Sequence, residues 1–238
     1  MKLANKNALV TGATGGLGRE IAIALSNNGC KVFITGRNKN SLETLSENLG
    51  SKCLGYLACD LELESEIEVL ASAATRAARF DSGIIDILIN SAGIFPVANV
   101  SDTTFEDFNS CFNINVRAPF FLSKLLCPEM KASSWGRIVN IGSSSAYGGF
   151  SGTSVYCASK HALLGISRSM YSEFKEEGVR VFSVSPGSIQ TPMGEKVINQ
   201  DYSTFMNPSE ISKFICELIS YDANMIAEEI RLNRVIVR

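Results

Sequence analysis

"NALVTGATGGLGREIAIALSNNG" (residues 7–29) joins a short apolar run to a longer segment of helical period through a turn that is rich in glycine. In the longer segment, a glycine suited to ending a helix stands at position 29, and one helical face collects Leu17, Ile21, Ala24 and Leu25. The stretch therefore predicts a strand, a tight turn and a helix, in that order.

The same pattern recurs twice in the next part of the chain. A strand at 31–36 precedes a helix at 39–50, and a strand at 53–61 precedes a helix at 64–80. Strands that alternate regularly with helices run parallel to one another.

Two further strands, at 85–90 and 136–143, are apolar almost throughout, as expected when helices cover both faces of a sheet. A chain of 238 residues is long enough for one such unit. We therefore expect an α/β fold: a single-domain, doubly wound, Rossmann-type parallel sheet of about seven strands that takes up residues 1–238.

Residues 104–130 form a long helical candidate, in which Pro119 predicts a kink or a break. The next helix is expected to start near Thr153 or Ser154, both good N-caps, and to run to Gly178.

The last part of the chain follows the same alternation with one interruption. A sixth strand at 179–187 ends at Pro-Gly, and residues 188–208 are polar with weak period, which predicts a substrate lid within the domain. A last helix at 209–221 and a last strand at 229–237 follow.

Composition excludes several classes of protein. The formal net charge is −2 and the basic residues are scattered, so we expect no nucleic-acid partner. No leader and no apolar run long enough to span a bilayer is visible, so we expect a cytoplasmic protein without a membrane partner. The seven cysteines lack CxxC spacing, which argues against a disulfide framework or a metal site and favours buried, unpaired thiols.

The first turn, T-G-A-T-G-G-L-G at 11–18, has the chemistry of an anion site. Its glycines let the backbone approach a diphosphate, and the following helix N-terminus offers unpaired N–H groups. Its place as the first strand-to-helix turn of a parallel sheet predicts dinucleotide binding, with Gly12, Gly16 and Gly18 as candidates.

The end of the second strand, "TGRN", bears on the choice of dinucleotide. An acid there would accept the 2′-OH of the adenosine ribose, whereas an arginine favours a 2′-phosphate. Because Arg37 is present and no acid is, we expect NADP(H) to be preferred and NAD(H) to be possible; the alternative is that Arg37 is an ordinary surface charge.

"YCASK" at 156–160 places Tyr156 and Lys160 four residues apart, on one face of a helix. A nearby ammonium favours the phenolate, so the pair predicts a tyrosine that exchanges protons near neutral pH. Alone, the pair would be read more readily as a core tyrosine and a surface lysine.

In their order and spacing, these motifs resemble the short-chain dehydrogenase/reductase family over essentially the whole chain. The Thr-Gly-x-x-x-Gly-x-Gly turn of that family is met by residues 11–18, its Tyr-x-x-x-Lys pair by Tyr156 and Lys160, and its aspartate after the third strand by Asp60. Its Asn-Asn-Ala-Gly segment is met by residues 90–93, where a serine replaces the second asparagine.

The resemblance implies hydride transfer between the nicotinamide C4 and a carbonyl or secondary alcohol, with Tyr156 as general acid or base. Lys160 would hold the nicotinamide ribose and lower the Tyr156 pKa, and Asn115 would act remotely by shaping the long helix. Ser143 would hydrogen-bond the reacting oxygen; the thirteen-residue spacing to Tyr156 favours it over Ser144 and Ser145. The implied cofactor-binding residues are Gly12, Thr14, Gly15, Gly16, Leu17, Gly18, Arg37, Asp60, Leu61, Asn90, Ala92, Gly93, Tyr156, Lys160, Pro186, Gly187, Ile189 and Thr191.

The substrate stays open at this point, since one fold hosts many functions. Relatives that reduce 3-oxoacyl groups on acyl carrier protein are one alternative, but Glu176 and Glu177 stand where a basic residue would suit that acidic partner. A sugar, a polyol or a steroid-like ring is another. Apolar residues of the expected lid suggest a partly apolar pocket: Met193, Val197, Tyr202, Phe205 and Met206.

Two further interpretations concern turnover and assembly. A non-catalytic regulator that senses NADP could share the fold, although such a protein has no need for the catalytic set. The resemblance also implies a homodimer or homotetramer that packs the two long helices, for which Phe108, Phe112, Phe120 and Leu164 are compatible residues. His161, the only histidine, is expected to be structural because neighbouring helical residues point in different directions.

Overall fold

All strands of the structure pair in parallel in one sheet. The structure is a computed structural model that describes residues 3–81, 83–197 and 200–235. The sheet has seven strands in the order β3-β2-β1-β4-β5-β6-β7. Their bounds are β1 (Asn7–Val10), β2 (Lys31–Gly36), β3 (Cys53–Ala58), β4 (Ile87–Asn90), β5 (Gly136–Ile141), β6 (Val179–Pro186) and β7 (Glu229–Leu232).

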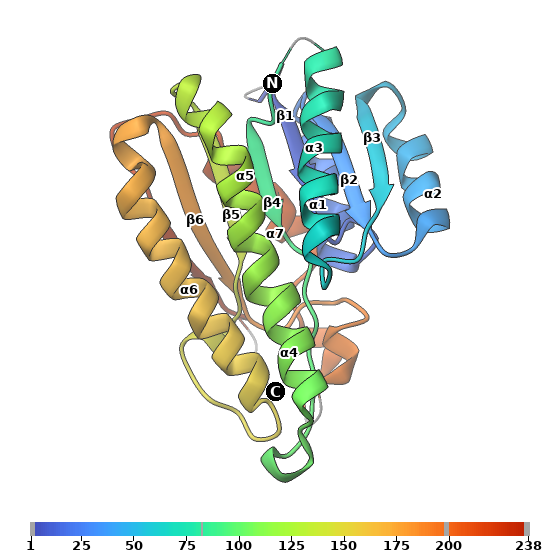
Figure 1. The fold of residues 1–238 in the computed structure, drawn as a ribbon. Coiled ribbons are helices and arrows are strands. Elements are labelled where there is room, and N and C mark those ends of the chain that lie inside the picture. Colours follow the sequence, from blue (N-terminus) through green and yellow to red (C-terminus); the bar gives the residue numbers. More distant parts are fainter. Residues whose placement is uncertain (1–2, 82, 198–199, 236–238) are drawn as a thin grey trace.

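Helices cover both faces of this sheet, which confirms the predicted doubly wound fold (Figure 1). One hydrophobic core lies under α1 (Gly16–Asn27), α2 (Lys39–Leu49) and α7 (Pro208–Ile219). The other lies under α3 (Glu64–Phe80), α5 (Ala118–Ala132) and α6 (Ser154–Phe174). Because the strand order reverses between β1 and β4, a crevice is expected at the carboxyl ends of these strands.

Most strands are shorter than the sequence pattern suggests at their carboxyl ends. β1 ends at Val10 and β3 at Ala58, and the residues beyond them form turns instead of sheet ladder. β7 ends at Leu232, although the pattern predicted a strand to 237, of which residues 236 and 237 lie outside the described part. The carboxyl edge of the sheet is therefore bordered by the turns that carry most of the predicted site residues.

The long helix predicted at 104–130 is divided into three parts. α4 (Phe105–Phe112) and α5 are joined by a π-helical segment, Asn113–Arg117. Pro119 stands near the start of α5, but the backbone before it is also helical, so its missing N–H and its ring act on the preceding turn. The irregularity lies in that turn, Asn113–Arg117, as expected for a proline within a helical run.

Helix α6 begins where the caps predicted, but its N-cap residue Thr153 makes no side-chain capping bond. The Thr153 hydroxyl donates instead to the Phe150 carbonyl oxygen at 2.9 Å. A short 3-10 turn, Lys175–Glu177, follows α6 and leads to Gly178, whose φ of 78° is left-handed, so the helical run ends at the predicted glycine.

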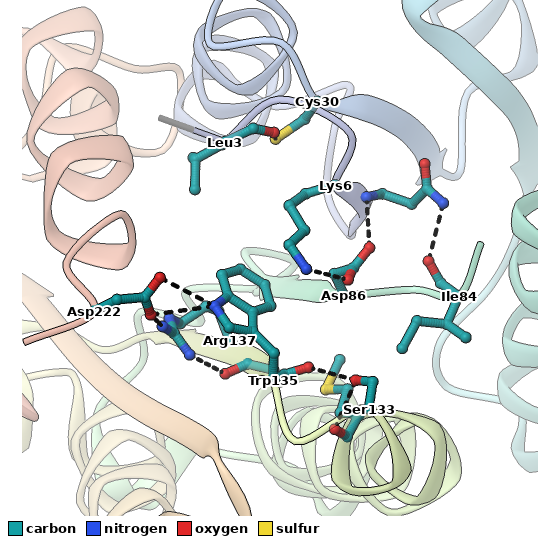
Figure 2. Close-up of polar contacts among 12 residues, drawn as sticks. Leu3, Lys6, Cys30, Ile84, Asp86, Ser133, Trp135, Arg137 and Asp222 are labelled. Atoms are coloured by element: carbon teal, nitrogen blue, oxygen red, sulfur yellow. Dashed lines mark hydrogen bonds and ion pairs between the residues drawn. The ribbon is translucent and has the colours of Figure 1, made fainter. Parts of the chain in front are cut away.

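A network of charged and aromatic side chains lies at the amino end of the sheet, near the starts of β1, β4 and β5 (Figure 2). Arg137 is 1% exposed and pairs with Asp222. The Trp135 ring lies between two cations, with Lys6 Nζ 3.9 Å and Arg137 Cζ 4.1 Å from its centroid. Lys6 Nζ also donates to Asp86 at 2.9 Å, so this end of the sheet is closed by paired side chains.

Among the described residues, all seven cysteines are unpaired thiols, and six of them are buried. Cys53 at the start of β3 is half-buried, so the expectation of seven buried thiols was wrong for this one. An edge strand has only one neighbour to cover it, which explains the exposure of Cys53.

Candidate active site

A cavity of about 570 Å³ opens at the carboxyl ends of the strands. The turns that follow β1 to β6 all contribute to its lining. Its size falls within the range that is usual for small-molecule and cofactor sites.

Close backbone packing fixes the glycines of the first turn. Gly12 has a φ of +66°, and a Cβ there would lie 2.8 Å from the backbone of Ala92. A Cβ on Gly18 would lie 2.3 Å from the Gly12 carbonyl oxygen, and one on Gly16 would lie 2.6 Å from the Thr191 side chain. A side chain at position 12 would push away the loop after β4, and one at position 16 or 18 would push α1 away from Thr191 or from the turn.

The N-terminus of α1 forms part of the cavity wall and is suited to an anion. Its N-cap Gly15 provides no side-chain capping bond, and its first turn holds no acidic residue. The N–H groups at the start of a helix carry partial positive charge, so this turn fits the diphosphate of a dinucleotide.

Two charged residues line the cavity near the ends of β2 and β3. Arg37 is exposed directly after β2, and Asp60 stands two residues after β3. The Asp60 carboxylate accepts a hydrogen bond from the Glu62 N–H at 3.0 Å, which fixes its orientation. This part of the cavity offers a cation and an acceptor to a bound nucleoside.

Tyr156 and Lys160 project from α6 into the same cavity that Ser143, two residues after β5, also lines. The tyrosine is 9% exposed and the lysine 6% exposed. Lys160 Nζ donates to the Ile141 carbonyl oxygen at 2.8 Å, and the Tyr156 ring packs edge-on against Phe95 with centroids 4.7 Å apart. These contacts hold both side chains in place.

Burial dominates the protonation of this pair. It raises the pKa of Tyr156 to about 12, against a smaller lowering by a hydrogen bond with Ser143. It also lowers the pKa of Lys160 to about 8. In the protein chain alone, the Tyr156 pKa therefore moves in the direction opposite to the predicted lowering, because desolvation of the phenolate is the largest influence on it.

Asn115 lies in the π-helical segment and does not line the cavity. It is fully buried, and its amide makes a two-way bond with the Ile94 backbone: Nδ2 donates to Ile94 O at 3.0 Å and Oδ1 accepts from Ile94 N at 2.9 Å. Nδ2 also lies 3.0 Å from Ser159 Oγ. Asn115 thus ties the loop after β4 to the helix that carries the Tyr–Lys pair.

Asn90 also lies behind the cavity wall. It is 2% exposed and donates through Nδ2 to Asn140 Oδ1 at 2.8 Å, which links β4 to β5. The remaining predicted site residues all line the cavity: Gly12, Thr14, Gly15, Gly16, Leu17, Gly18, Arg37, Asp60, Leu61, Ala92, Gly93, Ser143, Tyr156, Lys160, Pro186, Gly187, Ile189 and Thr191.

Sequence reasoning missed several residues that share the lining, and its choice of apolar residues in segment 188–208 was partly wrong. Met193 and Val197 line the cavity, but Tyr202, Phe205 and Met206 do not. The Phe205 side chain is 5% exposed, so it is buried away from the cavity. Five of the missed residues carry larger side chains and come from loops or turns without a motif: Phe95, Val97, Phe150, Lys196 and Gln200.

Three further observations concern the only histidine, metal binding and membrane spanning. His161 is exposed, lies outside the cavity lining, and bonds through Nδ1 to the Cys157 carbonyl oxygen at 2.8 Å. Within the described ranges, no cluster of three or more His, Cys, Asp or Glu side chains could hold a metal ion. No helix in the same ranges has the length and apolar character that crossing a bilayer requires.

Comparison of the sequence with known proteins identifies a family and similar relatives. A family model described as short chain dehydrogenase matches residues 6–202. An uncharacterized oxidoreductase of Thermotoga maritima is 34% identical over 195 residues, which cover 80% of this chain and 74% of the relative.

Solved structures show the same likeness. A short chain dehydrogenase/reductase family protein superposes with a TM-score of 0.86 at 33% identity, covering 98% of this chain and 97% of the other. The 3-ketoacyl-(acyl-carrier-protein) reductase of Brucella melitensis, complexed with NADH, superposes with a TM-score of 0.88 at 25% identity and 97% coverage of both chains.

Proposed function

We propose that this chain, which belongs to the short-chain dehydrogenase family and is an NAD(P)-dependent oxidoreductase, interconverts a carbonyl group and a secondary alcohol. Of the two cofactors, we propose that NADP(H) is preferred over NAD(H). A single observation carries the proposal. Tyr156, Lys160 and Ser143 border the cavity that also contains the glycine turn at the α1 N-terminus.

The residues of this wall have complementary roles. When bound, the nicotinamide supplies or accepts the hydride. In the direction of reduction, Tyr156 gives its proton to the carbonyl oxygen while Ser143 donates a hydrogen bond to the same oxygen. In oxidation, Tyr156 takes the proton of the alcohol. Lys160 would hold the nicotinamide ribose and would supply positive charge beside the phenol. Asn115 holds the adjoining loop from behind the cavity wall.

Arg37 supports the preference for NADP(H). It lines the cavity at the end of β2, with no acid at that strand end, and its exposed guanidinium can pair with a 2′-phosphate. The bound NADH of the Brucella neighbour keeps NAD(H) as the alternative.

Two substrate classes remain in the proposal. The Brucella neighbour is a 3-ketoacyl-(acyl-carrier-protein) reductase, which supports 3-oxoacyl groups. Glu176 and Glu177, in the turn after α6, would repel an acidic carrier protein, which supports instead a small carbonyl compound such as a sugar, polyol or steroid-like ring. We propose that residues 188–208 act as the substrate lid of a single domain, since several of them line the cavity.

We also propose a homodimer or homotetramer. The side chains of Phe108, Phe120 and Leu125 on α4 and α5 are 40% exposed or more, which is unusual for apolar side chains in one region. Leu164, in contrast, is 5% exposed, so burial within the single chain is enough to explain an apolar residue at this position.

The test is NADPH oxidation with a panel of carbonyl compounds, comparing wild type with Tyr156→Phe. Tyr171→Phe is the matched control, because it removes a phenolic hydroxyl from α6 outside the cavity. We expect turnover to fall by about 10²–10⁴-fold in Tyr156→Phe and to be retained in Tyr171→Phe. A genuine turnover that survives Tyr156→Phe would refute the acid role, and a protein that binds NADPH without turning over any compound would favour the regulator.

A further inference from the structure

Arg234, after β7, reaches the proposed lid from outside the cavity. Its Nη1 donates to Thr204 Oγ1 at 2.9 Å, and its Nη2 donates to Gln200 Oε1 at 2.8 Å. The guanidinium carbon also lies 5.1 Å from the centroid of the Phe205 ring. One side chain thus holds the second half of the lid at three positions.

These bonds determine which way the Gln200 amide faces. A guanidinium has only donors, so the amide atom that faces Arg234 must be the oxygen. Ser188 Oγ donates to the same oxygen at 2.9 Å. No hydrogen bond among residues 3–81, 83–197 and 200–235 uses the Gln200 amide nitrogen. Gln200 is one of the residues that line the cavity, and its amide nitrogen has two N–H donors that no described residue uses.

The charged side chains of the cavity lining also favour an anionic ligand on the lid side. These side chains are Arg37 and Asp60 at the nucleoside end, Lys160 on α6, and Lys196 in the lid. Lys160 is buried on α6 beside Tyr156, so Lys196 is the one cation that the described part of the lid adds to the lining. Two acids are close in sequence, Glu195 before Lys196 and Asp201 after Gln200, and neither lines the cavity. Asp201 bonds the N–H and the hydroxyl of Ser203.

We propose that the lid binds an anionic oxygen group of the substrate, a carboxylate or a phosphate, through Gln200 and Lys196, and that Arg234 is the residue that positions Gln200. The inference rests on the proposed function for the identity of the site. Charge-assisted hydrogen bonds to such a group are stronger than neutral ones. A substrate without it leaves the Gln200 donors and the Lys196 charge unpaired, so the lid selects for the anion.

Two variants separate the donors from the positioning. Gln200→Glu keeps an oxygen for Arg234 and Ser188 but replaces the donors with a negative oxygen. Arg234→Met removes the bonds to Gln200 and Thr204 and keeps most of the apolar stem. Arg231→Met is the matched control. The Arg231 guanidinium lies over the Tyr147 ring, 4.3 Å from its centroid, and makes no hydrogen bond to the lid residues that the structure describes.

The measurement is calorimetric binding in the presence of saturating NADP⁺, which needs no turnover. The probes are two matched pairs: levulinate with its methyl ester, and dihydroxyacetone phosphate with dihydroxyacetone. In wild type we expect the anionic member of at least one pair to bind about tenfold more tightly than its neutral partner. Gln200→Glu removes that preference, Arg234→Met reduces it, and Arg231→Met keeps it, while the affinity for the neutral members stays the same.

Three results would overturn the proposal: equal or unmeasurable binding of the anionic and neutral probes to wild type, a preference that survives Gln200→Glu, or a loss in both variants of NADPH affinity alone. The last would assign the donors to the cofactor. An anion preference in a protein without carbonyl turnover would instead refute the proposed function and leave the lid assignment intact.

Discussion

Lys160 donates a hydrogen bond to the carbonyl oxygen of Ile141, with Nζ and O 2.8 Å apart. Ile141 is the last residue of β5, and Ser143 stands two residues further along. One contact therefore joins the helix that carries Tyr156 and Lys160 to the strand that leads to Ser143. The relative positions of the three side chains depend on this junction between helix and sheet.

The buried Lys160 gives a prediction for stability against pH. Its pKa of about 8 lies below the ordinary 10.5, so between these pH values the unfolded chain holds a proton that the folded chain has lost. Unfolding then takes up a proton, and the stability of wild type relative to Lys160→Met should rise by about 3 kcal/mol over this interval. Denaturant titrations of both proteins at several pH values measure it; parallel curves would contradict the burial effect.

The raised pKa of Tyr156 gives a second prediction. Since burial raises the pKa of this phenol to about 12, wild type and Tyr156→Phe should show the same tyrosinate absorbance near pH 10 in the absence of cofactor. Saturating NADP⁺ should then lower the pKa of Tyr156, because a positive nicotinamide ring favours the phenolate. An additional tyrosinate in wild type below pH 10 without cofactor would show that the phenol is not desolvated.

The role proposed for Arg37 is tested by reversing its charge. We expect Arg37→Asp to weaken NADPH binding at least tenfold and to leave NADH binding nearly unchanged, because only NADPH carries the 2′-phosphate. Fluorescence titration with each cofactor measures both affinities. Arg76→Asp, with the same charge change on α3 outside the cavity, is the control. An equal effect of Arg37→Asp on both cofactors would remove Arg37 from the phosphate.

The close approach at Gly18 predicts a loss of stability. In Gly18→Ala the new Cβ would lie 2.3 Å from the Gly12 carbonyl oxygen, so the turn or α1 must move, at a cost of about 1–3 kcal/mol in unfolding free energy. A Cβ on Gly149 would have no atom within 4 Å, so Gly149→Ala should stay within about 0.5 kcal/mol of wild type. Thermal unfolding compares the two; equal stabilities would mean that the turn yields without cost.

The alternation of strands and helices could be predicted because each element has its own period of apolar residues along the sequence. The apolar runs of β4 and β5 and the amphipathic face of α1 report burial directly. The strand ends could not be predicted in the same way. Cys59 and Leu61 are apolar and buried, yet they belong to the turn after β3, because the ladder with β2 ends at Gly36 and Ala58.

The site divides along a similar line. Tyr156 and Lys160 are four residues apart on one helix, so their neighbourhood follows from spacing alone. Gln200 and Arg234 are joined across 34 positions by contacts of irregular segments, for which no period exists. The pKa of Tyr156 escaped prediction for another reason: it depends on desolvation, which only the packed structure determines.

The π-helical segment Asn113–Arg117 changes the rotational phase of the rod that contains α4 and α5. A π turn holds one residue more than an α turn, and each residue advances about 100° around the axis. The half before Asn113 can therefore face α6 while the half after Arg117 faces α3, as their packing shows. Loss of a single residue from this segment would bring the two halves back into phase, and one of them would have to give up its neighbour.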